Sequence, residues 1–187
     1  MSPNKSPKRA TTTRTIRINE LYDDVLKLEA DRRGISVNAL MDQILKRYVE
    51  AQRYFDNQTA VVLSDSTLLE LIGFLNTEML SIAGTNSGID RPKDRLLMRG
   101  LPLDYESVLW FISQVLGEYN GWYRSDYHPG RDEDQFHLRH RLGMKWSTFL
   151  QSYLEGMFYE LFNIKPRFNV LEHSVTITLD RKTIENL

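Results

Sequence analysis

The sequence predicts an α+β protein, in which a small N-terminal strand-helix-helix module precedes a separate α+β domain with a mixed or antiparallel sheet. Polar and apolar residues alternate over 13–18, as in a strand, and apolar residues then recur at helical spacing to about residue 55. Beyond residue 59, helical and alternating stretches are interspersed. We therefore expect a flexible basic arm over 1–11, a first domain over 12–55 and a second over 59–187.

The composition is that of a folded globular protein, because 41% of the 187 residues are hydrophobic and 26% are charged. The chain has no cysteine, which excludes disulfides, thiolate metal ligands and a cysteine nucleophile. No apolar run approaches the roughly 18 to 20 residues that cross a bilayer, and the first residues lack the apolar core of a secretory signal. We expect a cytoplasmic protein without a membrane span, a metal or a cofactor.

The N-terminal end is cationic, although the formal net charge of the chain is -1. No acidic residue occurs from Met1 to Arg17, and the basic residues of this stretch are Lys5, Lys8, Arg9, Arg14 and Arg17. Such an arm is attracted to the phosphates of nucleic acids through counterion release, but a solubilising tail has the same composition. Charge alone leaves both interpretations open.

Residues 13–18 indicate one short strand, with Ile16 and Ile18 on one side and its polar residues on the other. A lone strand leaves its backbone donors and acceptors unpaired, and no partner strand lies nearby in the sequence. The nearest identical edge belongs to a second copy of the chain. We expect two copies of this segment to pair as an antiparallel ribbon.

Two helices are expected after the strand. Asn19 suits the N-cap of the first helix and Gly34 its left-handed end, while Ser36 suits the N-cap of a second helix that runs to about Phe55. Apolar stripes lie along the first helix at Tyr22, Val25, Leu26 and Ala30, and along the second at Val37, Leu40, Met41, Ile44, Leu45, Tyr48 and Val49. So short a unit cannot bury both stripes alone, and we expect a homodimer.

This pattern resembles the ribbon-helix-helix family of β-ribbon DNA-binding proteins over about residues 10–53. Its most specific piece is the run from Gly34 to Asn38, which is similar to the turn between the family's two helices. The resemblance implies a prokaryotic transcription regulator of the repressor type, whose dimer inserts the ribbon into the major groove of double-stranded DNA. Dimers that assemble further into tetramers are also compatible with it.

The resemblance also assigns roles to individual residues. The base-contacting positions of the ribbon correspond to Thr13, Thr15 and Arg17. The phosphate clamp at the start of the second helix corresponds to Ser36, Val37 and Asn38. Arginine can pair with guanine through two hydrogen bonds, and free amides at a helix start can hold a phosphate, so the chemistry agrees. Further phosphate contacts are expected from Lys5, Lys8, Arg9 and Arg14, although Arg14 takes an inward position where the family often has an apolar residue.

Three alternatives remain at this stage. The ribbon can serve as a dimerisation module that does not touch DNA. The protein can be an antitoxin that neutralises a partner protein while repressing its own gene, although antitoxins usually carry short, poorly ordered tails. It can also be an enzyme on a DNA-binding arm, for which the polar candidates near the predicted core are His140, Tyr153, Glu172 and His173.

The second domain is expected to begin with helices. A β-rich segment over 59–63 precedes a helix that starts at 64–66, carries Leu68, Ile72, Leu75, Met79 and Ile82 on its buried side, and ends at Gly84 before a loop over 85–92. Residues 93–101 show no clear pattern. Asp104 caps another helix, which carries Val108, Ile112, Val115 and Tyr119 inward and closes at Gly121.

The remaining pattern predicts the sheet. Paired strands over 122–127 and 135–142 flank a turn at 128–130, a long helix covers 145–163, and a hairpin joins 167–171 to 175–179. The helix and hairpin between Gly143 and Leu179 resemble sensing domains of the 4-vinyl-reductase type, which implies ligand sensing or oligomerisation.

No catalytic signature such as GxSxG or HExxH occurs, and His137 and His140 point to opposite faces of a strand, which is poor geometry for a shared metal. The candidate pocket for a small-molecule effector is formed by His140, Trp146 and Tyr153. Each has a simpler interpretation as a core residue. In particular, His140 shares its side of the strand with apolar residues, opposite His137, Arg139 and Arg141.

Overall fold

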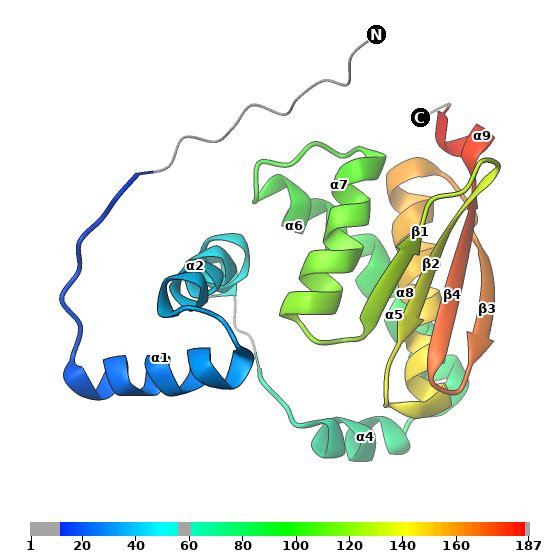
Figure 1. The fold of residues 1–187 in the computed structure, drawn as a ribbon. Coiled ribbons are helices and arrows are strands. Elements are labelled where there is room, and N and C mark those ends of the chain that lie inside the picture. Colours follow the sequence, from blue (N-terminus) through cyan, green and yellow to red (C-terminus); the bar gives the residue numbers. More distant parts are fainter. Residues whose placement is uncertain (1–11, 56–60, 186–187) are drawn as a thin grey trace, which may run out of the picture. The chain divides into compact units, whose positions relative to one another are not determined.

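The computed structural model describes residues 12–55 and 61–185, and the chain divides between Tyr48 and Val49 into two units. The division falls within a run of helical residues that continues to Phe55, so the end of the second expected helix belongs with the larger unit. Each unit is described by itself (Figure 1).

The first unit contains α1 (Glu20–Arg33) and α2 (Val37–Arg47). Both begin and α1 also ends as the sequence predicts, whereas α2 gives way at Tyr48 to a π-helical segment, before the end expected near Phe55. The Asn19 side chain accepts a hydrogen bond from the amide two residues on, at 2.9 Å. Gly34 adopts a left-handed φ of 65°, which lets its amide and the next one close the turn on the last carbonyls of α1. The Ser36 hydroxyl accepts the amide three residues on, at 3.1 Å. Both predicted N-caps and the turn are confirmed.

Residues 12–19 have no regular secondary structure in the single chain. Figure 1 draws the segment as a trace that leads into α1. A strand exists only where a neighbouring edge pairs with it, and the structure contains one copy of the chain. Pairing of this segment with a second copy therefore stays a prediction.

The second unit combines short helices with a four-stranded sheet. Its first helices are η1 (Tyr48–Gln52, π-helical and crossing the division), α3 (Arg53–Phe55), α4 (Asp65–Gly73), α5 (Thr77–Asp90) and α6 (Pro92–Leu97). These are followed by α7 (Tyr105–Trp110), the π-helical η2 (Phe111–Tyr119), α8 (Gly143–Phe162) and α9 (Arg181–Glu185). The strands are β1 (Arg124–His128), β2 (Glu133–Arg139), β3 (Arg167–Leu171) and β4 (Ser174–Asp180).

The sheet is entirely antiparallel and has the order β1-β2-β4-β3. Phe136 pairs with Ile177 and Leu138 with Val175, and these four side chains are buried on the face that α8 covers. Figure 1 shows α5 packed on α8, which forms a further layer. The predicted α+β class and both predicted hairpins are confirmed, and the sheet is antiparallel throughout.

The helix predicted from 64–66 to Gly84 is wrong, because two helices occupy this stretch. The chain turns after Gly73, and the Asn76 side chain caps α5 by accepting the amide three residues on, at 2.8 Å. Gly84 lies in the middle of α5, where a Cβ would come within 2.5 Å of the Phe149 carbonyl oxygen of α8. Glycine at this position therefore allows two helices to approach closely and does not end a helix.

Two further predictions in this region are also wrong. Residues 61–63 form no strand, while residues 59 and 60 lie outside the described residues. β-Branched side chains favour a strand only where a neighbouring edge pairs with it. The loop expected over 85–92 is mostly helical, because α5 continues to Asp90 and Pro92 then starts α6, at a position where proline suits a helix.

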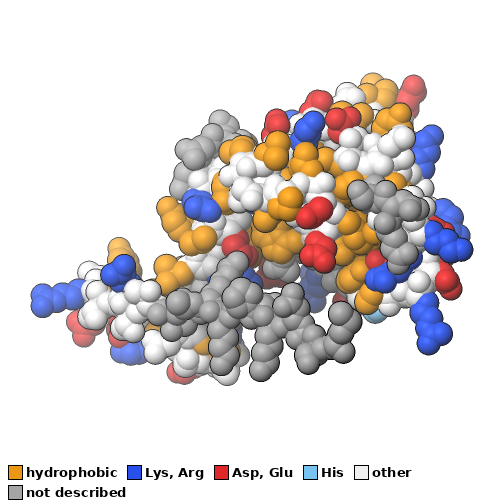
Figure 2. All heavy atoms as spheres, turned by 90° about the horizontal axis from the view of Figure 1, so that it is seen from above, with side chains coloured by type: hydrophobic (Ala, Val, Ile, Leu, Met, Phe, Trp, Pro, Cys, Tyr) orange, Lys and Arg blue, Asp and Glu red, His pale blue; other side chains and the backbone are white. Residues whose placement is uncertain are grey.

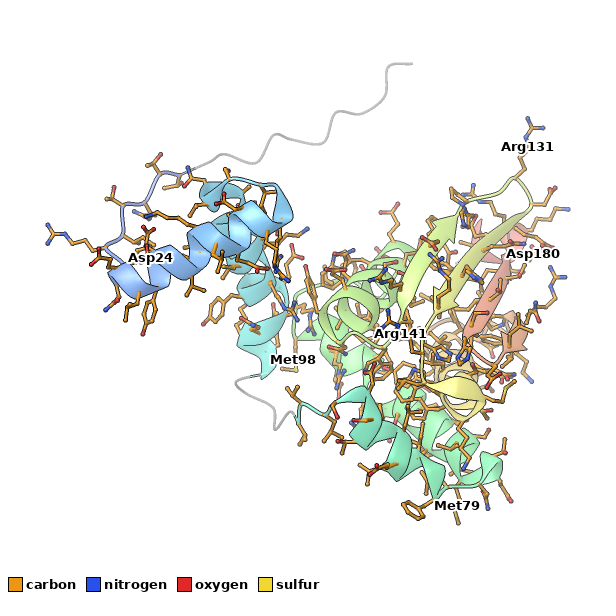
Figure 3. All side chains as sticks on the ribbon, turned by 60° about the horizontal axis from the view of Figure 1, so that its bottom comes forward. Asp24, Met79, Met98, Arg131, Arg141 and Asp180 are labelled. Carbon is orange, nitrogen blue, oxygen red and sulfur yellow. The ribbon has the colours of Figure 1, made fainter. Side chains whose placement is uncertain are left out.

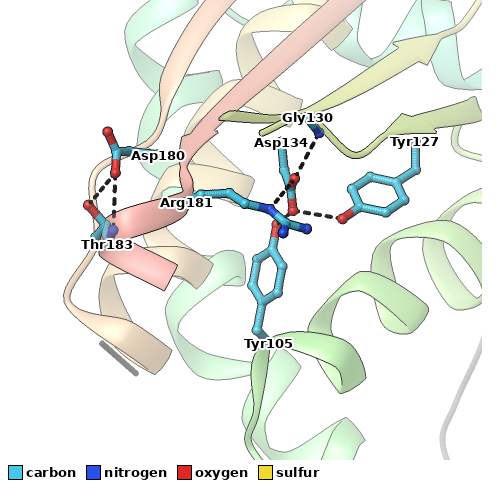
Figure 4. Close-up of polar contacts among 7 residues, drawn as sticks. All are labelled: Tyr105, Tyr127, Gly130, Asp134, Asp180, Arg181 and Thr183. Atoms are coloured by element: carbon cyan, nitrogen blue, oxygen red, sulfur yellow. Dashed lines mark hydrogen bonds and ion pairs between the residues drawn. The ribbon is translucent and has the colours of Figure 1, made fainter. Parts of the chain in front are cut away.

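A buried carboxylate ties the end of the sheet to the helices (Figure 4). Asp134 is 1% exposed and accepts hydrogen bonds from the Tyr127 hydroxyl at 2.7 Å and the Tyr105 hydroxyl at 3.1 Å. The Gly130 amide at 3.3 Å and Nε of Arg181 at 3.1 Å donate to its other oxygen. Burial opposes ionisation, but these donors outweigh it and hold the pKa of Asp134 below its ordinary value.

We expect Asp134→Asn to lower the free energy of unfolding by about 1 to 3 kcal/mol at neutral pH. The asparagine amide has only one oxygen to accept hydrogen bonds, and its NH₂ group cannot accept from the donors that surround the carboxylate. A lowered pKa stabilises the fold fully above the ordinary value of 3.8, and this contribution is lost as the pH falls through the folded-state value. Denaturant unfolding at neutral and acid pH, with the exposed Asp132→Asn as control, measures both effects. A deficit that persists unchanged in acid would contradict the ionic role.

Candidate functional site

The first unit leaves most of its apolar side chains exposed. Among residues 12–48, only Ala30 and Leu40 are buried, whereas Leu21 is 72% exposed. The large exposed apolar side chains of this unit are Ile16, Ile18, Leu21, Tyr22, Val25, Leu28, Ile44, Leu45 and Tyr48. Figure 2 shows hydrophobic side chains at the molecular surface beside charged ones. This number of exposed apolar side chains in so small a unit is typical of a surface that packs against another segment of protein.

The start of α2 has the geometry of an anion site. Ser36 precedes the helix in an extended conformation, and its hydroxyl caps the helix while Val37 and Asn38 occupy the first turn. The first amides of an α-helix have no acceptor within the helix, and the helix dipole adds partial positive charge at this end. The structure therefore brings together Ser36, Val37 and Asn38, as the resemblance implies, in an arrangement that can hold a phosphate.

The strand residues expected to read bases lie in the described part of the chain. Thr13, Thr15 and Arg17 are exposed, as are Arg14, Ile16 and Ile18, so the single chain does not sort the segment into an inner and an outer face. The predicted phosphate contacts Lys5, Lys8 and Arg9 lie outside the described residues.

The charged side chains of α1 mostly pair with each other. Arg32 and Arg33 both bind the Glu29 carboxylate, and these contacts, that of Arg32 first, lower the pKa of Glu29 to about 2. Lys27 binds Asp23 at 2.5 Å. Because these cations are already paired within the helix, α1 offers few free cationic groups to a phosphate.

His140 is a partly buried residue whose hydrogen bonds give it a structural role. Its Nδ1 accepts the Leu142 amide at 3.2 Å, so the proton lies on Nε2 and is donated to the Ser147 hydroxyl at 2.9 Å. Ser147 is fully buried and donates in turn to the Leu171 carbonyl at 2.6 Å. Burial, followed by the nearby His173, lowers the pKa of His140 to about 4.

The histidine and serine side chains meet, but their hydrogen bonds run in the wrong direction for nucleophilic catalysis. A general base must accept the proton of the serine, whereas the imidazole of His140 donates to Ser147 and the serine donates to a carbonyl. This pair therefore connects the end of β2 to α8 and to the β3–β4 turn. It gives no support to the enzyme alternative.

The three residues of the expected ligand pocket do not share a cavity. Trp146 and Tyr153 are buried among aromatic rings, with Trp122 5.5 Å from Trp146 and 5.1 Å from Tyr153 between ring centroids. The Tyr153 hydroxyl is the only buried side-chain N or O atom in the described residues without a hydrogen-bond partner. Burial raises its pKa to about 12, which keeps it neutral. Both residues belong to the core.

His140 instead borders an open groove of about 970 Å³ between η2, β1 and the segment after β2. Figure 3 shows Arg141 at the mouth of this region. Cationic and acidic groups occur in equal number along it: Arg124, Arg139 and Arg141, against Asp65, Glu118 and Asp126. Arg139 and Asp126 pair at 2.6 Å. The groove therefore has room for a small molecule without a marked preference for anions or cations.

A contact that the sequence did not predict holds η1 within the second unit. The Tyr119 hydroxyl donates to the Glu50 carboxylate, and Nε of Arg99 lies 3.4 Å from the Glu50 carbonyl oxygen. The Arg99 guanidinium stacks on the Tyr54 ring, 4.3 Å from its centroid. Arg99 and Tyr119 are 49 and 69 residues from Glu50 in the sequence, so no local sequence pattern indicates these contacts.

No group of three or more histidine, aspartate or glutamate side chains in the described ranges is placed to hold a metal. No helix within 12–55 or 61–185 combines the length and apolar character that a bilayer span requires.

We expect His140→Gln to reduce the free energy of unfolding by about 1 kcal/mol at neutral pH, because the Leu142 amide loses its acceptor. A histidine pKa lowered from 6.5 to about 4 contributes stability fully above pH 6.5, and this contribution is lost as the pH falls toward 4. The variant should therefore lose less stability than the wild type over that interval. Unfolding curves across this range, with His128→Gln as control, measure the slope, and equal slopes would refute the assignment.

Comparisons of the chain with protein-family models, with curated proteins and with solved structures found no match. The functional assignment therefore depends on the residues and geometry described above.

Proposed function

We propose that the protein is a dimeric, sequence-specific DNA-binding transcription regulator of the ribbon-helix-helix type. Two copies of the 13–18 segment pair as an antiparallel ribbon that enters the major groove. Thr13, Thr15 and Arg17 contact bases, while the start of α2 and the basic arm contact phosphates. The second unit supplies a sensory or assembly function.

The observation that carries this proposal is the exposed apolar surface of the first unit. Side chains such as Leu21, Val25 and Leu28 project from α1 into solvent, although their spacing is that of a buried stripe. Burying one such side chain contributes about 1.5 to 3 kcal/mol. A second copy offers the same surface and an edge for the strand, so one association satisfies both the apolar side chains and the backbone groups.

The DNA-binding part of the proposal follows from what the ribbon would present. With Ile16 and Ile18 turned inward by pairing, alternation places two threonines and an arginine of each copy outward. Arginine can donate two hydrogen bonds to guanine, and threonine offers a hydroxyl and a methyl group to base edges. The capped start of α2 adds a phosphate site that fixes the register on the duplex.

The second unit favours a regulator over an antitoxin. It has its own core and an ordered sheet, whereas antitoxins usually end in short, poorly ordered tails. The groove bordered by η2 and β1 is the place where a small-molecule effector would bind.

We expect Arg17→Ala to weaken binding to the preferred operator by about 1 to 3 kcal/mol and to relax one base position, because a bidentate contact to guanine is lost. Selection of binding sequences from random duplexes by the full chain, followed by titration of the enriched site, measures both effects. Arg131→Ala, at the periphery of the second unit, removes the same charge and serves as control (Figure 3). If the wild type enriches no sequence, or if the two variants behave alike, the base-reading role is wrong.

We expect Val25→Asp to convert the dimer into a monomer, because the apolar surface of the first unit would then enclose a carboxylate. Gln43→Asp, at an exposed polar position of α2, adds the same group as a matched control. Analytical ultracentrifugation over a range of concentrations distinguishes the two. An unchanged dimer in Val25→Asp, or a wild type that is monomeric while bound to its operator, would contradict the paired ribbon.

A further inference from the structure

The interval between Arg53 and Arg91 contains no lysine, arginine or histidine, which is the longest such interval in the sequence. Cations make up 24 of the 187 residues, so a stretch of this length would ordinarily contain several. Its acidic residues are Asp56, Asp65, Glu70, Glu78 and Asp90. The stretch includes α4 and α5, so neither of these two helices has a cationic side chain of its own.

The same two helices expose large apolar side chains. Leu71 and Phe74 are three residues apart at the end of α4, and Met79 and Ile82 are three apart on α5. All four are exposed, and Phe74 is 89% exposed. We call these four residues the α4–α5 patch. Figure 3 shows Met79 on the side of α5 away from the sheet.

The α4–α5 patch does not belong to the hydrophobic core, although both helices also contribute residues to that core. Ile72 and Leu80 are buried on the inner sides of α4 and α5, so the exposed residues form a second apolar side of each helix. An aromatic ring that is almost fully exposed, with three aliphatic side chains on the same pair of helices, indicates a contact surface for another molecule.

The acidic groups around the patch are free. Asp65, Glu70, Glu78 and Asp90 are exposed, and none has an ion pair or a side-chain hydrogen bond within the described residues. The one lysine that reaches α4 is Lys145, whose ammonium group donates to the Gly73 carbonyl at 2.6 Å at the end of the helix. Glu70 and Glu78, which adjoin Leu71 and Met79 in sequence, therefore have no cationic partner within the described residues. Asp65 instead lines the groove that also contains Arg124, Arg139 and Arg141, and Asp90 lies at the far end of α5.

The negative charge of this surface favours one class of binding partner for the α4–α5 patch over the others. The same surface of a second copy would bring identical acidic groups against these ones, and like charges across an interface oppose association. Nucleic acid is repelled for the same reason. A protein segment with apolar and cationic side chains satisfies both the patch and the carboxylates. We propose that the α4–α5 patch and its acidic border bind a cationic amphipathic segment of another protein.

The proposed surface lies within the second unit and does not depend on the ribbon. Apolar contacts with Phe74 and its neighbours would supply most of the affinity, because exposed ion pairs contribute little. The carboxylates would speed association and exclude acidic segments. Binding should therefore weaken with salt and should require both apolar and cationic side chains in the partner.

The test uses the full chain and a fluorescent synthetic helix of leucine and lysine at amphipathic spacing, titrated by fluorescence anisotropy. Two matched peptides replace lysine by glutamate or leucine by serine. We expect only the leucine–lysine peptide to bind. Phe74→Ser should weaken its binding at least about tenfold, and Glu78→Lys, which removes one exposed ion pair, by about two- to fivefold. Leu171→Ser on β3 and Glu172→Lys in the β3–β4 turn are matched controls, because they make the same changes at exposed positions elsewhere. Circular dichroism checks that every variant is folded.

The double variant Glu70→Lys/Glu78→Lys makes the test sharper, because it should reverse the preference toward the leucine–glutamate peptide. Equal binding of both peptides to the wild type, or equal loss in the control variants, would overturn the proposal. So would the absence of binding to the leucine–lysine peptide. Self-association of the wild type that Phe74→Ser abolishes would show that a second copy occupies the patch, and would also overturn it.

Discussion

The first unit depends on a surface that one copy of the chain does not bury. Its local signals are strong, since Asn19 and Ser36 cap the helices and Gly34 closes the turn between them. Each cap contributes about 1 kcal/mol, whereas burial of one exposed leucine or valine contributes about 1.5 to 3 kcal/mol. The caps fix where the helices begin and end, and the proposed association would supply most of the stabilisation. This is why we place dimerisation before DNA binding in the proposed function.

Features with local causes could be predicted from the sequence. The two N-caps of the first unit, the turn at Gly34, the long helix α8 and the hairpin β3–β4 all follow from residues within a few positions of one another. Gly84 was misassigned for a physical reason, since glycine ends helices and also lets helices approach closely. Only the position of the Phe149 carbonyl shows that Gly84 serves close helix packing and does not end a helix. That position depends on how α8 packs against α5.

The candidate site also contains some features that could be predicted from local sequence and others that could not. Ser36, Val37 and Asn38 could be identified from sequence because a helix start is a local feature, and the structure places them together. The structural role of His140 was the simpler of two interpretations. Which of its ring nitrogens donates a hydrogen bond could be assigned only from the positions of the Leu142 amide and the Ser147 hydroxyl. The contact of Glu50 with Tyr119 could not be foreseen, because it joins residues 69 positions apart.

Charge is segregated along this chain in a way that its net value of -1 conceals. The stretch from Met1 to Arg17 has basic residues and no acidic ones, while the interval from Arg53 to Arg91 has acidic residues and no basic ones between its ends. A surface of either kind attracts a partner of the opposite sign and repels its own. In the proposed function, the basic arm would bind DNA while the acidic, apolar surface, which DNA repels, would remain open to a protein, so that one chain could contact a duplex and a protein at once.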